Sequence, residues 1–211
     1  MPDTHVHRAH HFQDLGKQVH AERLGMWLFL GTEVLLFAGL FVGYSFYRTL
    51  YPHAFAEASH HLDTPFGTLE TFDLITSSLA MALGIHFTRT GRRRLSVAAV
   101  ALTILMGLAF LGMHSVEYRH EYLEGMLPGQ YYHFAELPLA GASLFFTMYF
   151  LMTGLHSLHV IAGVGVLTYL CVRTYRGAYS PAYQTPLELG GLYWHLVDMI
   201  WIFLYPLLYL I

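Results

Sequence analysis

Five long apolar runs divide this chain, and short polar segments separate them. Each run is close to or above the ~20 residues that a helix needs to cross a bilayer. The pattern predicts an all-α protein, an integral membrane bundle of five transmembrane helices at residues 23–211, after a polar, histidine-rich cytoplasmic tail at 1–22. The predicted helices lie at about 24–47, 66–88, 95–116, 137–172 and 189–211.

The fourth run is the longest and carries no charged residue. Two spans joined by a turn would need ~40 residues or more, so we expect one long, tilted helix. Its second residue, Pro138, fits the first turn of a helix, where the missing N–H is tolerated.

Positive charge predicts the orientation of the bundle, because cytoplasmic loops of membrane proteins collect Lys and Arg. With five spans, nine of the eleven basic residues fall on the side of the tail and of the loops near 89–94 and 173–176. Splitting the fourth run would give seven against four. We therefore expect the N-terminus in the cytoplasm and the C-terminus outside.

Composition excludes several classes of protein. The chain is 55% hydrophobic and 12% charged, against ~45–50% and ~25% in globular domains. A single cysteine, Cys171, rules out an internal disulfide or a cysteine-rich metal centre. The net charge of −3 gives no reason to expect nucleic acid as a partner.

Two acidic residues fall near the middle of predicted spans. At ~1.5 Å per residue, Glu33 and Asp198 each lie roughly 14 Å from the cytoplasmic end of their helix. Histidines with i, i+3 spacing share this depth, and such pairs can interact on one helix face. The result is a predicted mid-membrane belt of Glu33, His156, His159, His195 and Asp198.

This belt has two interpretations that the residues alone leave open. An ionised carboxylate in hydrocarbon costs at least ~2.5–3.5 kcal/mol, so intramembrane acids are protonated, paired or functional, as in proton-handling or lipid-headgroup sites. Polar side chains also join helices for purely structural reasons, at ~0.6 kcal/mol per pair on average. A functional role is indicated more strongly for Glu33 than for the other belt residues, because its neighbours on the helix, such as Phe29 and Phe37, are apolar.

Fifteen histidines raise the question of haem or metal, since bundles bind both through inward-facing side chains. The histidine-rich boxes of membrane di-iron oxygenases do not recur, and the pair at 156 and 159 stands alone. We therefore expect no metal site and no redox cofactor in this chain.

Four motifs resemble a known family. They are LFLGTEVLLFAGLFVGYSFY at 28–47, HSVEY at 114–118, TGLHSLHVIAGV at 153–164 and YWHLVDMIWIFLY at 193–205. In this order they are similar to subunit III of the haem–copper terminal oxidases, that is cytochrome c oxidase and its quinol-oxidising relatives. The resemblance covers residues 22–211.

The resemblance implies an accessory subunit that is not catalytic by itself. Haems and copper would lie in the partner subunits, with catalytic subunit I as the main partner beside subunit II and other respiratory-complex subunits, and phospholipids would be bound. It implies that Glu33 matches the carbodiimide-reactive glutamate of the family, which is associated with proton uptake. A second group of motif residues would form a polar network or contact lipids: Glu117, His156, His159, His195 and Asp198.

The chain departs from many family members, which have seven helices and a lipid cleft between the first two and the other five. A chain of five helices resembles a bacterial form of the family, and we therefore expect this protein in the bacterial inner membrane. The expected function is thus a non-redox subunit III of a proton-pumping oxygen reductase, with cytochrome c or quinol as donor. The alternatives are the homologous accessory subunit of a nitric-oxide reductase and, from another class, a membrane haem protein or an independent proton channel.

Overall fold

The computed structural model describes residues 15–128, 131–134, 137–181 and 183–211. Apart from two isolated backbone bridges, the regular structure of these residues is helical, so the predicted all-α class is confirmed. The helices are α1 (Leu15–Leu50), α2 (Pro52–His60), α3 (Thr64–Arg89), α4 (Arg93–Glu124), α5 (Ala142–Tyr175) and α6 (Thr185–Tyr209).

Four of these helices, α1, α4, α5 and α6, are long and apolar enough to cross a membrane. Helix α3 corresponds to the predicted span at 66–88 and has 26 residues, but it is not among these four. Polar residues within the helix, among them Asp73, Ser77, Ser78 and His86, lower the mean hydropathy of its apolar stretch. Four candidate spans are therefore established, and the fifth stays a prediction.

Several helix ends differ from the predicted ones. Helix α1 begins at Leu15, so residues 15–22 of the predicted tail are helical, whereas residues 1–14 lie outside the described part. Helix α4 continues past 116 to Glu124, where Gly125 ends it with a positive φ of 79°. Glycine adopts this left-handed conformation without the steric cost of a Cβ.

The start of α5 was predicted too early. The helix begins at Ala142 instead of 137, after Gly141 with φ 99°, so Pro138 lies in the preceding loop. Helix α2 was not predicted; it starts with Pro52 at a position that tolerates proline, and Phe55 on its buried face is fully enclosed.

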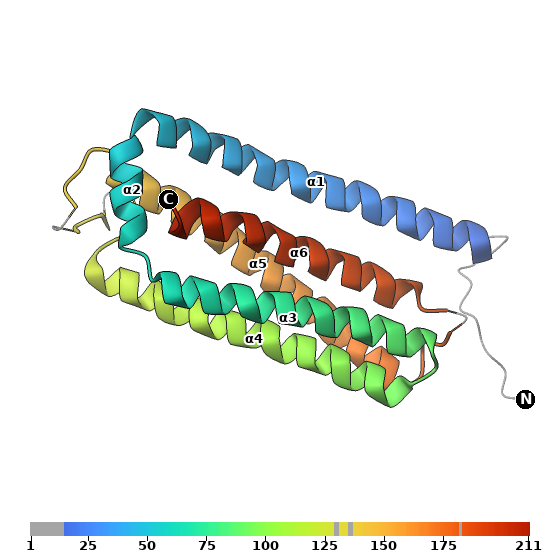
Figure 1. Ribbon diagram of the computed structural model, residues 1–211. Coiled ribbons are helices and arrows are strands. Elements are labelled where there is room, and N and C mark those ends of the chain that lie inside the picture. The colour runs from blue at the N-terminus through green and yellow to red at the C-terminus, as the bar shows by residue number, and fades with distance from the viewer. Residues whose placement is uncertain (1–14, 129–130, 135–136, 182) are drawn as a thin grey trace, which may run out of the picture.

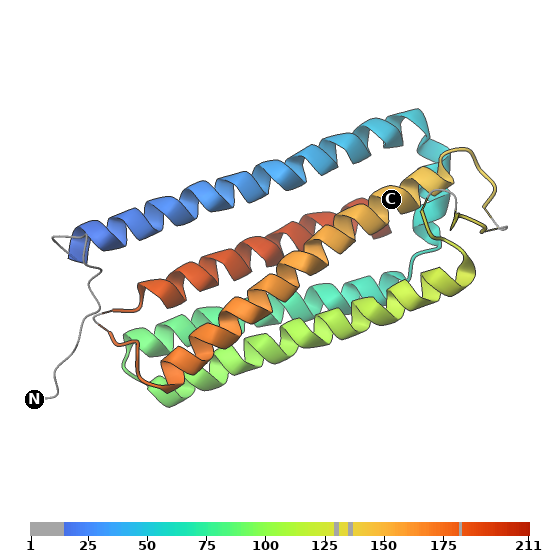
Figure 2. The same cartoon turned by 180° about the vertical axis from the view of Figure 1, so that it is seen from behind.

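The long helices lie roughly along one direction (Figures 1 and 2). Helices α3 and α4 form an antiparallel hairpin, and α6 lies between this hairpin and α1. Helix α5 crosses beside α6 and contacts α4 at one side and α1 at the other, while α2 runs across one end of the bundle. The core lies around α6, where Trp194 and Trp201 are fully buried.

Basic residues gather at the end of the bundle opposite α2. This end contains the start of α1 and the α3–α4 and α5–α6 connections (Figure 1). Arg8 lies outside the described residues, and eight of the other ten Lys and Arg belong to this end; Arg48 and Arg119 lie toward the other. The segments that the five-span prediction placed in the cytoplasm therefore share one end of the molecule.

Candidate functional site

The Glu33 carboxylate pairs with a histidine from another helix. Glu33 on α1 lies 2.8 Å, Oε2 to Nε2, from His159 on α5, and both side chains are 16% exposed. The other ring nitrogen of His159, Nδ1, is 2.8 Å from the backbone oxygen of Leu155. Because a carbonyl only accepts, Nδ1 carries a proton and donates to Leu155. Nε2 therefore either accepts a proton from Glu33 or, when protonated, donates to its carboxylate.

Two aromatic residues hold His159 in this orientation. The ring of Phe37, one turn after Glu33 on α1, packs edge-on against the imidazole with 5.3 Å between centroids. The hydroxyl of Tyr193 on α6 donates to the backbone oxygen of His159 at 3.1 Å. The pair is thus fixed between three helices, α1, α5 and α6.

The other members of the predicted belt occupy separate environments. His156 is fully buried between the rings of Phe110 and Trp201, and neither ring nitrogen has a hydrogen-bond partner in the described part of the chain. His195 Nδ1 lies 2.5 Å from the hydroxyl of Ser78 on α3. Asp198 is 3% exposed, and both its carboxylate oxygens are buried. Of the belt residues, the structure brings Glu33 and His159 into direct contact.

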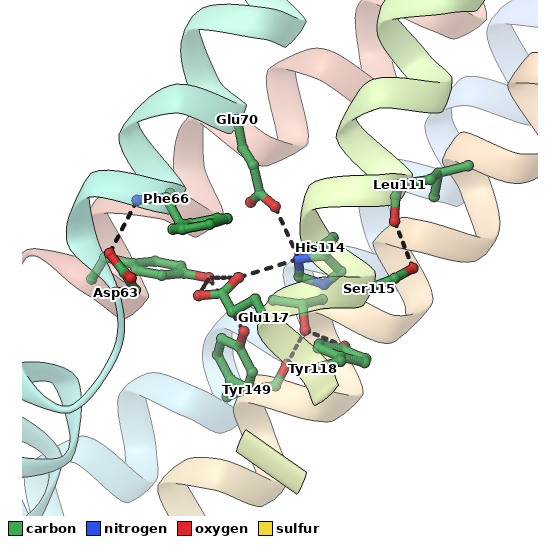
Figure 3. Close-up of polar contacts among 12 residues, drawn as sticks. Asp63, Phe66, Glu70, Leu111, His114, Ser115, Glu117, Tyr118 and Tyr149 are labelled. Atoms are coloured by element: carbon green, nitrogen blue, oxygen red, sulfur yellow. Dashed lines mark hydrogen bonds and ion pairs between the residues drawn. The ribbon is translucent and has the colours of Figure 1, made fainter. Parts of the chain in front are cut away.

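Glu117, the remaining motif residue, belongs to a buried polar cluster toward the α2 end of the bundle (Figure 3). The hydroxyl of Tyr209 donates to its two carboxylate oxygens, at 2.9 Å each. His114 Nδ1 lies 3.5 Å from Glu117 Oε2 and 3.5 Å from Glu70 Oε1. The exposed fractions of Glu70, His114 and Glu117 are 0%, 3% and 5%.

Sequence reasoning missed two members of this cluster, Glu70 and His114. Glu70 lies outside the four family motifs and outside the predicted mid-membrane belt. A signal was present in the motif HSVEY, because His114 and Glu117 have the i, i+3 spacing that places both on one helix face. The contact with Glu70 depends on the packing of α3 against α4, which no spacing within one helix reveals.

Comparison with known proteins agrees with the motifs. A family described as cytochrome c oxidase subunit III matches residues 6–211. Cytochrome c oxidase subunit 3 of Corynebacterium diphtheriae is 31% identical over 195 residues, which covers 89% of this chain and 87% of the relative.

The chain is also similar to a subunit of a ubiquinol oxidase and to a vertebrate protein. Cytochrome bo(3) ubiquinol oxidase subunit 3 of Pseudomonas aeruginosa is 29% identical, over 88% of this chain and 83% of the relative. Cytochrome c oxidase subunit 3 of Gallus gallus is 29% identical, over 96% and 73%. The family match extends over nearly the whole sequence, including both members of the Glu33–His159 pair, and the chain belongs to the cytochrome c oxidase subunit III family.

Proposed function

We propose that this subunit supports proton uptake by its oxidase through the Glu33–His159 pair. The observation that carries the proposal is the 2.8 Å contact between the Glu33 carboxylate and the His159 imidazole, which joins α1 to α5. The family consists of subunits of haem–copper oxidases and carries no redox cofactor itself. A function in proton transfer therefore has to come from the side chains of the subunit, acting beside a catalytic partner.

The chemistry of the pair suits a proton relay. Since Nδ1 of His159 is engaged with Leu155, exchange takes place between Nε2 and the carboxyl group of Glu33. One shared proton gives either a neutral pair or an ion pair without movement of the heavy atoms. The partial exposure of both side chains lets water or a neighbouring subunit reach them from the side of the bundle.

The Glu33–His159 pair then lies at mid-depth in a bundle of five membrane-spanning helices, of which α3 is the fifth. Helix α3 packs antiparallel to α4, and its 26 residues make it as long as the spanning α6 with its 25. Concentration of the basic residues at one end supports a cytoplasmic N-terminus. With its bacterial relatives, the chain fits the inner membrane, where catalytic subunit I and subunit II would be its partners.

Lipid binding is part of the proposal and has its own support. At the basic end, a pocket of about 320 Å³ is lined by Arg23, Trp27, Arg89 and Glu188 among others. Both guanidinium groups pair with Glu188, at 3.1 and 2.8 Å, and both arginines are more than half exposed. An arginine has five N–H donors, so each keeps donors for a phosphate group.

The test combines labelling with turnover. We expect Glu33→Gln to abolish labelling of the assembled subunit by a hydrophobic carbodiimide, which modifies protonated carboxyl groups in apolar settings. We also expect Glu33→Gln and His159→Gln to lower oxidase turnover more at alkaline than at neutral pH, because bulk protons are scarcest there and a relay then matters most. Labelling is measured by peptide mass analysis, and turnover by oxygen consumption of the complex in liposomes.

Glu57→Gln is the matched control, because Glu57 is an exposed carboxylate on α2. This variant should leave both labelling and turnover unchanged. Unchanged labelling in Glu33→Gln would remove Glu33 as the reactive group, and an unchanged pH profile in both pair variants would reject the relay.

A further inference from the structure

We infer that Glu70, His114 and Glu117 form a binding site for a divalent transition-metal ion, with Zn²⁺ as the best fit. One ligating atom from each residue lies within 4.8 Å of the others, and all three side chains are buried. The site would join α3, which contributes Glu70, to α4, which contributes the other two (Figure 3). It is independent of the proton relay at Glu33, which lies on α1.

The distances within the cluster favour a metal over direct hydrogen bonds. His114 Nδ1 is 3.5 Å from Glu70 Oε1 and equally 3.5 Å from Glu117 Oε2. Good N–H···O hydrogen bonds are shorter, at ~2.7–3.2 Å. Ligands that surround Zn²⁺ tetrahedrally at ~2.0–2.1 Å are separated from one another by ~3.3–3.4 Å. The distance from His114 Nδ1 to each of the two carboxylate oxygens is therefore close to the distance between neighbouring ligands of a tetrahedral zinc ion.

The unpaired polar atoms of the cluster point to a missing ligand. Both oxygens of Glu70 and both ring nitrogens of His114 are buried and have no hydrogen-bond partner among the described residues. The two oxygens of Glu121, one turn beyond Glu117, are in the same condition. Buried polar atoms are nearly always paired. A doubly charged ion would satisfy two of these groups, Glu70 and His114, and would balance the charges of the Glu70 and Glu117 carboxylates.

The surroundings hold the ligands in place as at other metal centres. Tyr209 donates to both oxygens of Glu117, so the carboxylate is oriented by an outer hydrogen bond. The His114 ring stacks on Phe110, with 5.6 Å between centroids and 10° between planes. These contacts come from α6 and α4, and they fix two of the three ligands before an ion arrives.

An ion can reach the cluster from the α2 end of the bundle. A pocket of about 230 Å³ is lined by Glu117 together with Asp63, Phe66, Val116 and His120. Glu117 therefore borders both the pocket and the cluster, and the polar side chains of Asp63 and His120 line the approach. The same pocket can supply a water molecule as the fourth ligand of a tetrahedral site.

The donor set selects the kind of ion. One imidazole and two carboxylates suit Zn²⁺ and also Mn²⁺, whereas Ca²⁺ and Mg²⁺ prefer oxygen alone. Zn²⁺ has no redox chemistry. A zinc ion here would tie α3 to α4 and is compatible with a family that carries no redox cofactor.

The test measures zinc in the purified oxidase complex. Histidines 5, 7, 10 and 11 are replaced by alanine in every sample, so that the N-terminal segment does not bind zinc adventitiously. After incubation with ZnCl₂ and removal of free metal, we expect Glu70→Gln, His114→Gln and Glu117→Gln each to lose one zinc per complex. X-ray absorption at the zinc edge should show mixed imidazole and carboxylate ligation in the parent that is lost in the variants.

Glu124→Gln is the matched control, because Glu124 is a partly exposed carboxylate on α4 that pairs with His120 at 3.0 Å and lines neither the cluster nor the pocket. This variant should retain the zinc of the parent. Equal zinc in the parent and all three cluster variants, or equal loss in the control, would overturn the site. If a variant does not assemble, zinc should still raise the thermal midpoint of the parent complex; no zinc-dependent shift there would overturn the site as well.

Discussion

At the scale of single residues, glycine decides how the large aromatic side chains of α6 are packed. A Cβ at Gly107 on α4 would lie 2.6 Å from the Trp194 ring, and one at Gly163 on α5 would lie 2.9 Å from it. The fully buried indole therefore occupies a slot that two glycines leave open, and its Nε1 donates to Ser77 on α3 at 3.0 Å. This single side chain links α6 to three other helices.

Gly107→Ala is expected to destabilise the complex by about 1–3 kcal/mol, the usual cost of overpacking a well-packed interior. Gly112→Ala on the same helix is the control, because a Cβ there meets nothing within 4 Å. Alanine also favours helix over glycine by up to ~1 kcal/mol, so the control should be neutral or stabilising. Thermal unfolding of the purified complex distinguishes the two; equal loss in both variants would contradict the packing argument.

At the scale of elements, the end of α6 is completed by side chains of other helices. Its last carbonyl groups have no partner within the helix, as at every helix C-terminus. The backbone oxygen of Leu207 accepts from Tyr44 on α1 at 2.6 Å, and that of Leu208 accepts from Ser59 on α2 at 2.7 Å. The short helix α2 thus has a structural role in capping α6, one of the four candidate membrane spans.

We expect Ser59→Ala to cost about 1–3 kcal/mol, because it leaves a buried carbonyl without its donor. Hydrogen exchange at residues 205–211 should become faster, which mass spectrometry of the complex would detect. Ser45→Ala provides the comparison, since the hydroxyl of the exposed Ser45 donates to the backbone oxygen of Phe41 within its own helix. Unchanged exchange in Ser59→Ala would show that water replaces the serine hydroxyl without cost.

At the scale of the whole molecule, the two ends differ in charge. The basic end also holds the ion pairs of Glu188 with Arg23 and Arg89, which connect α6 to α1 and α3. The opposite end holds α2 and the buried cluster around His114. This asymmetry along the helix axis is what orients a bundle in a bilayer.

The orientation and the fifth span can be tested together with His60→Cys and Thr90→Cys, each in a Cys171→Ser background that has no other cysteine. Both positions are exposed and flank α3. A membrane-impermeant thiol reagent added to intact cells should label the first variant and not the second. Labelling of both would mean that α3 does not span, and the reverse pattern would mean that the bundle is inverted.

Much of this protein could be predicted because the physical signals are local. The cost of exposing polar groups to hydrocarbon forces long apolar runs into helices, so the all-α class follows from the sequence. Glu33 could be singled out on the same principle. The positions of glycines along a helix are less informative: a Cβ added at Gly39 or Gly43 would meet nothing within 4 Å, whereas one at Gly84 would lie 2.9 Å from Val100 of α4.

The sequence by itself indicated the five long helices and the family, and it singled out an acid inside a predicted span, since these depend on composition and spacing along one chain. Only the tertiary structure decided which polar groups meet: Glu33 with His159, Ser78 with His195, and Glu70 with His114 and Glu117. The physical reason is that apolar helix surfaces pack in many ways of similar energy. Side chains distant in sequence become neighbours only when one packing is realised.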